Sequence, residues 1–185
     1  MSISAKAAGR LLTITLFVAT AVLPPVLRSI TRKPANSEVA AQLDAAKVEA
    51  SELARDADDM TALVHNDTNW QSHADTLNRI AEHVNNMGKI LEKLQSERDE
   101  ASPWQKQAID RMVPLLKDIA TNTTAAIEHL NKNQVRPVSS DYKDYLEQNA
   151  DTAHELADTI SAFDKYGRTR AKLEELQDKL EIPNH

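Results

Sequence analysis

The sequence predicts an all-α protein: an up-down-up-down four-helix bundle with coiled-coil-like seams, preceded by an N-terminal signal or membrane-anchor helix. Apolar residues repeat every four then three positions along four long segments, which is the period of a helix and not of a strand. The chain has only 3 Gly and 2 Phe in 185 residues, a composition typical of long helices. We expect residues 1–33 to be the signal or anchor, residues 34–167 the bundle, and residues 168–185 a projecting helical tail.

Charge is divided unevenly along the chain. Residues 1–33 contain five basic and no acidic side chains, which leaves 17 basic and 28 acidic side chains in the remainder, a formal charge of −11. Because phosphate binding needs a basic face, we expect no nucleic-acid partner. The absence of cysteine excludes disulfides, thiolate metal sites and thiol catalysis.

The amino terminus has the pattern of an export or anchoring segment. A short basic region, residues 1–10, precedes an uncharged and largely apolar run, residues 11–27. A small-residue motif predicts signal cleavage after Ala21, whereas an uncleaved anchor would continue to Arg28. Both alternatives make the membrane a partner through this segment. Both also predict an exported domain, periplasmic or membrane-anchored and facing outside the cytoplasm.

The first helix is predicted over residues 37–65, with Asn36 or Ser37 as its N-cap. The acidic residues beside its seam, including Asp56, are expected on a solvated face. Its alanine-rich seam lets a neighbouring helix approach closely. The seam consists of Val39, Leu43, Ala46, Ala50, Leu53, Ala57, Met60 and Val64.

The second helix is predicted to follow a capping box formed by Thr68 and Gln71 and to end near Asp99. Gly88 falls within its apolar seam, where glycine costs about 1 kcal/mol relative to alanine. We therefore expect a bulky residue opposite Gly88. The seam consists of Ala74, Leu77, Ala81, Val84, Leu91 and either Leu94 or Gln95.

The third helix is predicted to open at Pro103, inside a second capping box formed by Ser102 and Gln105. Pro114 lies well inside this helix, and a kink near Asp110 is expected because the apolar pattern resumes in phase. The seam consists of Ile109, Met112, Leu116, Ile119, Thr123, Ala126 and Leu130.

The last helix is predicted to start at Ser139 or Ser140 and to continue far beyond the length of the others. Gly167 lies near the level where the other helices end, so a bend is expected there. The seam before it consists of Tyr142, Leu146, Asn149, Ala153, Leu156, Ile160 and Phe163. Beyond it, an apolar stripe of Leu173, Leu176 and Leu180 is expected to pack on residues 24–36 or on the tail of a second chain.

Histidines are the candidates for chemistry that stand out. His83, Asp118 and His154 are predicted at similar heights in the bundle, and they are our candidate metal ligands. Only the segment from Asp151 to His154 approximates the Glu-x-x-His unit of bundled carboxylate metal proteins. His65, His73 and His129 are predicted near one end of the bundle, pointing to solvent. We expect no cofactor and no catalytic residues, because no nucleophile elbow or haem attachment motif is present.

These observations lead to two hypotheses of function. The first is a non-enzymatic, exported or membrane-tethered bundle that acts in protein interaction or self-association at the cell envelope, with a protein partner or a second copy of the chain. The alternative is a sensor-like bundle that binds a small ligand or a metal in its interior. Trp70 and Trp104, each in the first turn of a helix, are interpreted as packing staples.

Overall fold

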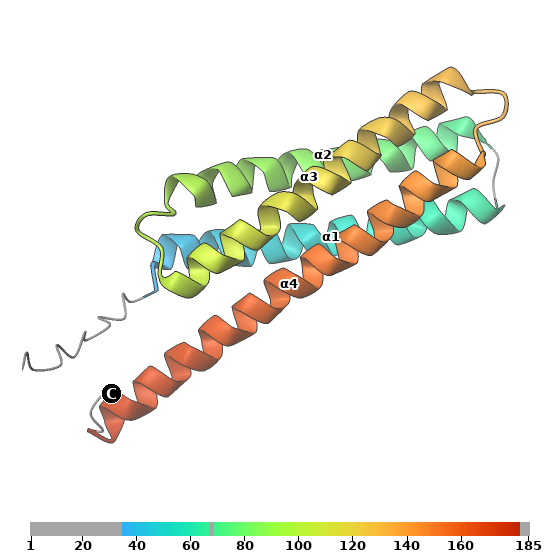
Figure 1. Ribbon diagram of the computed structural model, residues 1–185. Helices are drawn as coiled ribbons and strands as arrows, with labels where there is room; N and C mark the ends of the chain where they lie inside the picture. The colour runs from blue at the N-terminus through green and yellow to red at the C-terminus, as the bar shows by residue number, and fades with distance from the viewer. Residues whose placement is uncertain (1–34, 67–68, 182–185) are drawn as a thin grey trace, which may run out of the picture. The chain divides into compact units, whose positions relative to one another are not determined.

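The computed structural model describes residues 35–66 and 69–181, which form four α-helices and no strands (Figure 1). The predicted all-helical class is confirmed for this part of the chain. The predicted signal or anchor, residues 1–33, lies outside the described residues. Among those described, no helix is long and apolar enough to cross a membrane. The helices are α1 (Ser37–Asn66), α2 (Trp70–Ser96), α3 (Pro103–Lys132) and α4 (Ser140–Lys179).

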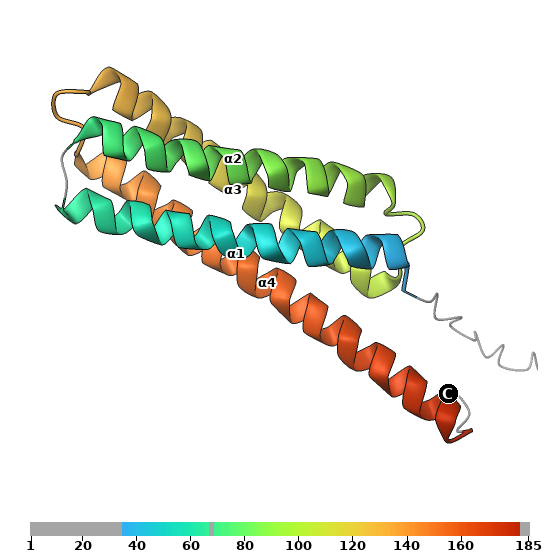
Figure 2. The ribbon, with the colours of Figure 1, turned by 180° about the vertical axis from the view of Figure 1, so that it is seen from behind.

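Each helix packs against the helix before and after it in the chain, and α4 also packs against α1. The connections are short, so successive helices run in opposite directions, as both views show (Figures 1 and 2). α4 has 40 residues, whereas α1 and α3 have 30 each. Its last turns therefore extend past the start of α1 without another described helix beside them (Figure 2).

The predicted seams form the core on three helices. All eight seam residues of α1 and all seven of α3 are buried, as are those of α4 up to Ile160. On α2 the prediction was partly wrong, because Ala74, Ala81 and Val84 are only half-buried. This helix contacts both α1 and α3, and the centre of its buried face therefore shifts to His73, Leu77, Ile80, Met87, Leu91 and Leu94.

Local capping chemistry sets the helix starts. The Asn36 side chain accepts hydrogen bonds from the backbone N–H groups of Glu38 and Val39, at 2.8 and 3.3 Å. Of the two predicted caps of α4, Ser139 is the N-cap, and its hydroxyl accepts from the N–H of Tyr142. At α2 the N-cap is Asn69, which accepts from the N–H of Gln71. The predicted partner at that start, Thr68, lies outside the described residues.

Gln105 joins the starts of two helices. Its side-chain oxygen accepts from the N–H of Ser102, as in a capping box, and also from the N–H of Asn36. Its amide nitrogen donates to the carbonyl oxygen of Asn36 at 2.8 Å. The residue predicted to cap α3 therefore also holds the start of α1 through two hydrogen bonds to the backbone of Asn36.

Neither of the two helical glycines that the structure describes has the role predicted for it. A Cβ atom added to Gly88 would have no neighbour within 4 Å, so the expected bulky residue opposite it is absent. A Cβ added to Gly167 would lie 2.6 Å from Cη2 of Trp104. α4 continues as one helix through Gly167, which was predicted to be a bend, and this glycine makes room for an indole ring.

Candidate functional site

The three predicted metal ligands have different neighbours. His83 on α2 lies against α1, with Nδ1 2.6 Å from Glu49 Oε1. His154 on α4 contacts Asp58 of α1, with Nε2 2.9 Å from Oδ1. Asp118 lines a shallow polar depression between α3 and α4, of about 260 Å³, together with Asp151. Among the described residues, no group of three or more His, Cys, Asp or Glu side chains is arranged to hold a metal ion.

A polar cluster between α1 and α2 surrounds Asp56. This residue was predicted on the solvated face of α1, but it is 1% exposed, so that prediction was wrong. Arg79 Nε donates to Asp56 Oδ2 at 3.0 Å, and His83 Nε2 lies 3.5 Å from the same oxygen. Because these partners come from α2, the pattern within α1 gives no sign that the carboxylate is buried. The cluster links α1 to α2 through these contacts.

Two of the three histidines predicted at one end of the bundle, His73 and His129, form an aromatic stack with Tyr142, whereas His65 is exposed as expected. His73 is fully buried, which corrects the expectation that it points to solvent. Its Nδ1 lies 3.2 Å from the Tyr142 hydroxyl, and its ring stacks on the tyrosine ring at 5.8 Å. His129 stacks on the same ring at 5.2 Å. Burial raises the pKa of the Tyr142 phenol, so the phenol stays neutral. Because Tyr142 and His73 are both fully buried, the stack is part of the core.

The tail leucines are exposed on the last turns of α4. Leu173, Leu176 and Leu180 are 55%, 45% and 65% exposed, respectively. They do not continue the core seam of α4. If the spacing of four and three residues continued beyond Phe163, the next seam positions would be Gly167, Arg170 and Glu174. The apolar positions come one residue earlier in each turn, which rotates the stripe by about 100° around the helix. The stripe is therefore in line with Tyr166, which is seven residues before Leu173.

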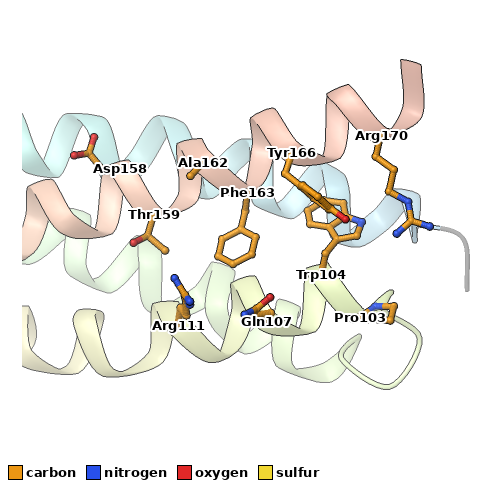
Figure 3. Close-up of a pocket in the computed structure, with 10 residues that line it drawn as sticks. All are labelled: Pro103, Trp104, Gln107, Arg111, Asp158, Thr159, Ala162, Phe163, Tyr166 and Arg170. Carbon is orange, nitrogen blue, oxygen red and sulfur yellow. The ribbon is translucent and has the colours of Figure 1, made fainter. Parts of the chain in front are cut away.

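A groove of about 680 Å³ lies between the first turns of α3 and the second half of α4 (Figure 3). Three aromatic side chains, Trp104, Phe163 and Tyr166, line it, and Figure 3 shows them extending into the space between the two helices. Trp104 and Tyr166 meet edge to face, with ring centroids 5.8 Å apart. The other lining residues are Pro103, Gln107, Arg111, Asp158, Thr159, Ala162 and Arg170.

The indole of Trp104 forms one end of this groove. It is 9% exposed and packs over the backbone at Gly167, which explains why a residue without a side chain stands there. The prediction that Trp104 is a packing staple agrees with this burial. Its part in the groove was missed, because the groove depends on the meeting of α3 with the second half of α4. The signal in the sequence that could have indicated a groove is the pair of aromatic residues, Phe163 and Tyr166, at the end of the apolar seam of α4.

Two guanidinium groups border the groove. Arg111 lies over the ring of Phe163, 5.8 Å from its centroid, in a cation–π arrangement. Arg170 donates to Glu174 at 2.9 Å, and this hydrogen bond raises the pKa of the Arg170 guanidinium. Asp158 contributes the one carboxylate of the lining. The groove thus combines flat apolar surface with two arginines, of which one is paired with an acidic side chain, and one aspartate.

Comparison of the chain with protein-family models, with curated protein sequences and with solved structures finds no match.

Proposed function

We propose that this protein is a non-enzymatic bundle, exported or tethered to the membrane by residues 1–33, that acts in protein interaction or self-association at the cell envelope. The observation that carries this proposal is the exposed stripe of Leu173, Leu176 and Leu180 on a helix that extends past the bundle. Leucines at such spacing on a helix are the usual means by which one helix packs on another. The stripe also continues the line of Tyr166, so a bound helix would lie along both.

Single cysteines test self-association, because the chain has no cysteine of its own. We expect Leu176→Cys in the full chain to form a covalent dimer on mild oxidation. Glu175→Cys is the matched control, since it is one residue away but on a different side of the helix. Equal dimer yields from the two variants, or a monomeric mass for the wild-type chain by light scattering, would reject self-association through this stripe.

Export is tested separately with a reporter enzyme that is active only outside the cytoplasm. Fused after residue 185, it should be active in cells when residues 1–33 are present and inactive when they are deleted. Activity that does not depend on residues 1–33 would refute the proposed role of this segment.

A second candidate function, small-ligand binding, is favoured by the groove beside Trp104. Its volume of about 680 Å³ falls within the range typical of small-molecule sites, about 300–1,000 Å³. Its aromatic lining provides the apolar surface that such sites use. The test is whether a neutral apolar dye, N-phenyl-1-naphthylamine, binds the full chain and loses affinity on Tyr166→Ser.

A further inference from the structure

The charge of the groove is opposite to that of the domain around it. Residues 34–185 have an excess of eleven acidic side chains, whereas the groove lining has two arginines and one aspartate. A positive charge on an acidic domain attracts anions locally, whereas the acidic surface around it repels them. An attraction for negative groups therefore depends on whether one of these arginines is free of an acidic partner.

The two arginines differ in their availability. Arg170 is already paired with Glu174 at 2.9 Å. Arg111 forms no ion pair with any residue that the structure describes, and its neighbour is the face of Phe163. A guanidinium held beside an aromatic ring keeps its five N–H donors free for a carboxylate, sulfonate or phosphate oxygen.

The aromatic side chains define the rest of the ligand. Phe163 extends from α4 into the groove opposite Arg111 and Gln107 of α3 (Figure 3). Tyr166, one turn further along α4, lies beside Trp104. A ligand body of aromatic rings or a short alkyl chain would remove these faces from water while its negative group reaches Arg111.

We propose that the groove between α3 and α4 is a binding site for an amphipathic organic anion. The negative group of the ligand pairs with Arg111, and its apolar body packs on Phe163 and Tyr166. The Asp158 carboxylate repels the negative group of the ligand and so limits the affinity of the site. This inference rests on the second candidate function, small-ligand binding, and adds the chemical class of the ligand.

Two dyes with the same aromatic body separate charge from apolar contact. 8-Anilinonaphthalene-1-sulfonate has a sulfonate, and N-phenyl-1-naphthylamine lacks it. The dissociation constant of each is measured by fluorescence titration of the full chain. We expect Arg111→Gln to weaken sulfonate-dye binding about tenfold, as for loss of one charge-assisted hydrogen bond, and to leave the neutral dye within twofold.

Three further variants control the interpretation. Asp158→Asn should tighten sulfonate-dye binding severalfold, and Tyr166→Ser should weaken both dyes, which locates them in the groove. Arg136→Gln makes the same chemical change as Arg111→Gln, but in the loop between α3 and α4 at the far end of α3, and should alter neither. Circular dichroism of each variant checks that the fold is retained.

The outcomes distinguish the inference from the function on which it rests. The anion assignment is overturned if Arg111→Gln leaves the sulfonate dye unaffected, or if Arg136→Gln weakens it equally. If the neutral dye binds in the groove and the sulfonate dye does not, the assignment fails but small-ligand binding stands. If neither dye responds to Tyr166→Ser, both fail.

Discussion

Gly167 and Gly88 allow the packing of Trp104 to be measured against a matched control. Each glycine lies inside a helix, where replacement by alanine gains about 1 kcal/mol from helix propensity alone. At Gly88 nothing lies within 4 Å of the new methyl group, so Gly88→Ala should stabilise the protein by about that amount. At Gly167 the methyl group would lie 2.6 and 2.9 Å from Cη2 and Cζ2 of Trp104.

The indole cannot move freely because it is buried, so Gly167→Ala should incur an overpacking cost of about 1–3 kcal/mol. Helix propensity is common to both variants, and the difference between them therefore isolates this steric term. At about 2–4 °C per kcal/mol, Gly167→Ala should melt several degrees below Gly88→Ala.

Thermal and urea unfolding of the full chain, followed by circular dichroism, give the two free energies. In a Trp104→Phe background the smaller ring should remove most of the cost of Gly167→Ala, as a double-mutant cycle would report. The reasoning is refuted if the two alanine variants are equally stable, or if the cost persists with phenylalanine at position 104.

Two other predictions concern charge and the core. Burial raises the pKa of Asp164, but hydrogen bonds from Lys47 and Arg168 outweigh this effect and hold its pKa below 3.8. A carboxyl group whose pKa is lower in the folded state than in the unfolded state increases the free energy of unfolding above about pH 4. This contribution is lost as the pH falls through the folded-state pKa. Asp164→Asn should therefore be less stable than wild type at pH 7, by about 1 kcal/mol, and should converge with it near pH 2; urea titrations that show a constant gap would contradict this. Leu53 is fully buried and Glu52 exposed, so Leu53→Asp should cost about 3–5 kcal/mol and Glu52→Ala less than about 0.5, and equal melting temperatures would show that the face is inverted.

The helix starts, and the buried faces of α1, α3 and most of α4, could be predicted because they depend on residues close together in the sequence. Ser102, Pro103 and Gln105 define the start of α3 locally, and the capping interaction between Gln105 and Ser102 is present in the structure. The bond from Gln105 to Asn36 could not be predicted, since these residues lie 69 positions apart. The same limit applies to Asp56, whose partners come from another helix.

The groove could not be predicted either, because it also depends on residues that are far apart in the sequence. The seam pattern indicates which residues face a neighbour, but it does not indicate where two helices leave space between them. Phe163 was predicted in the core and is half-buried, because it faces the groove as well as the bundle. The exposure of Leu173, Leu176 and Leu180 could be predicted from the sequence, because the last helix is longer than the others and its end has no helix of the bundle beside it.

The difference between the two parts of α4 has a consequence for its dynamics. From Tyr142 to Ile160 the helix is held by burial in the core, whereas from Leu173 to Lys179 every residue except Gln177 is exposed. The last turns are stabilised by exposed pairs such as Glu175 and Lys179, and such pairs contribute only about 0.3–0.5 kcal/mol each. Backbone amides there should consequently exchange hydrogen for deuterium by local fraying, far faster than amides in the bundle. Protection of these amides would then signal directly that the stripe is covered.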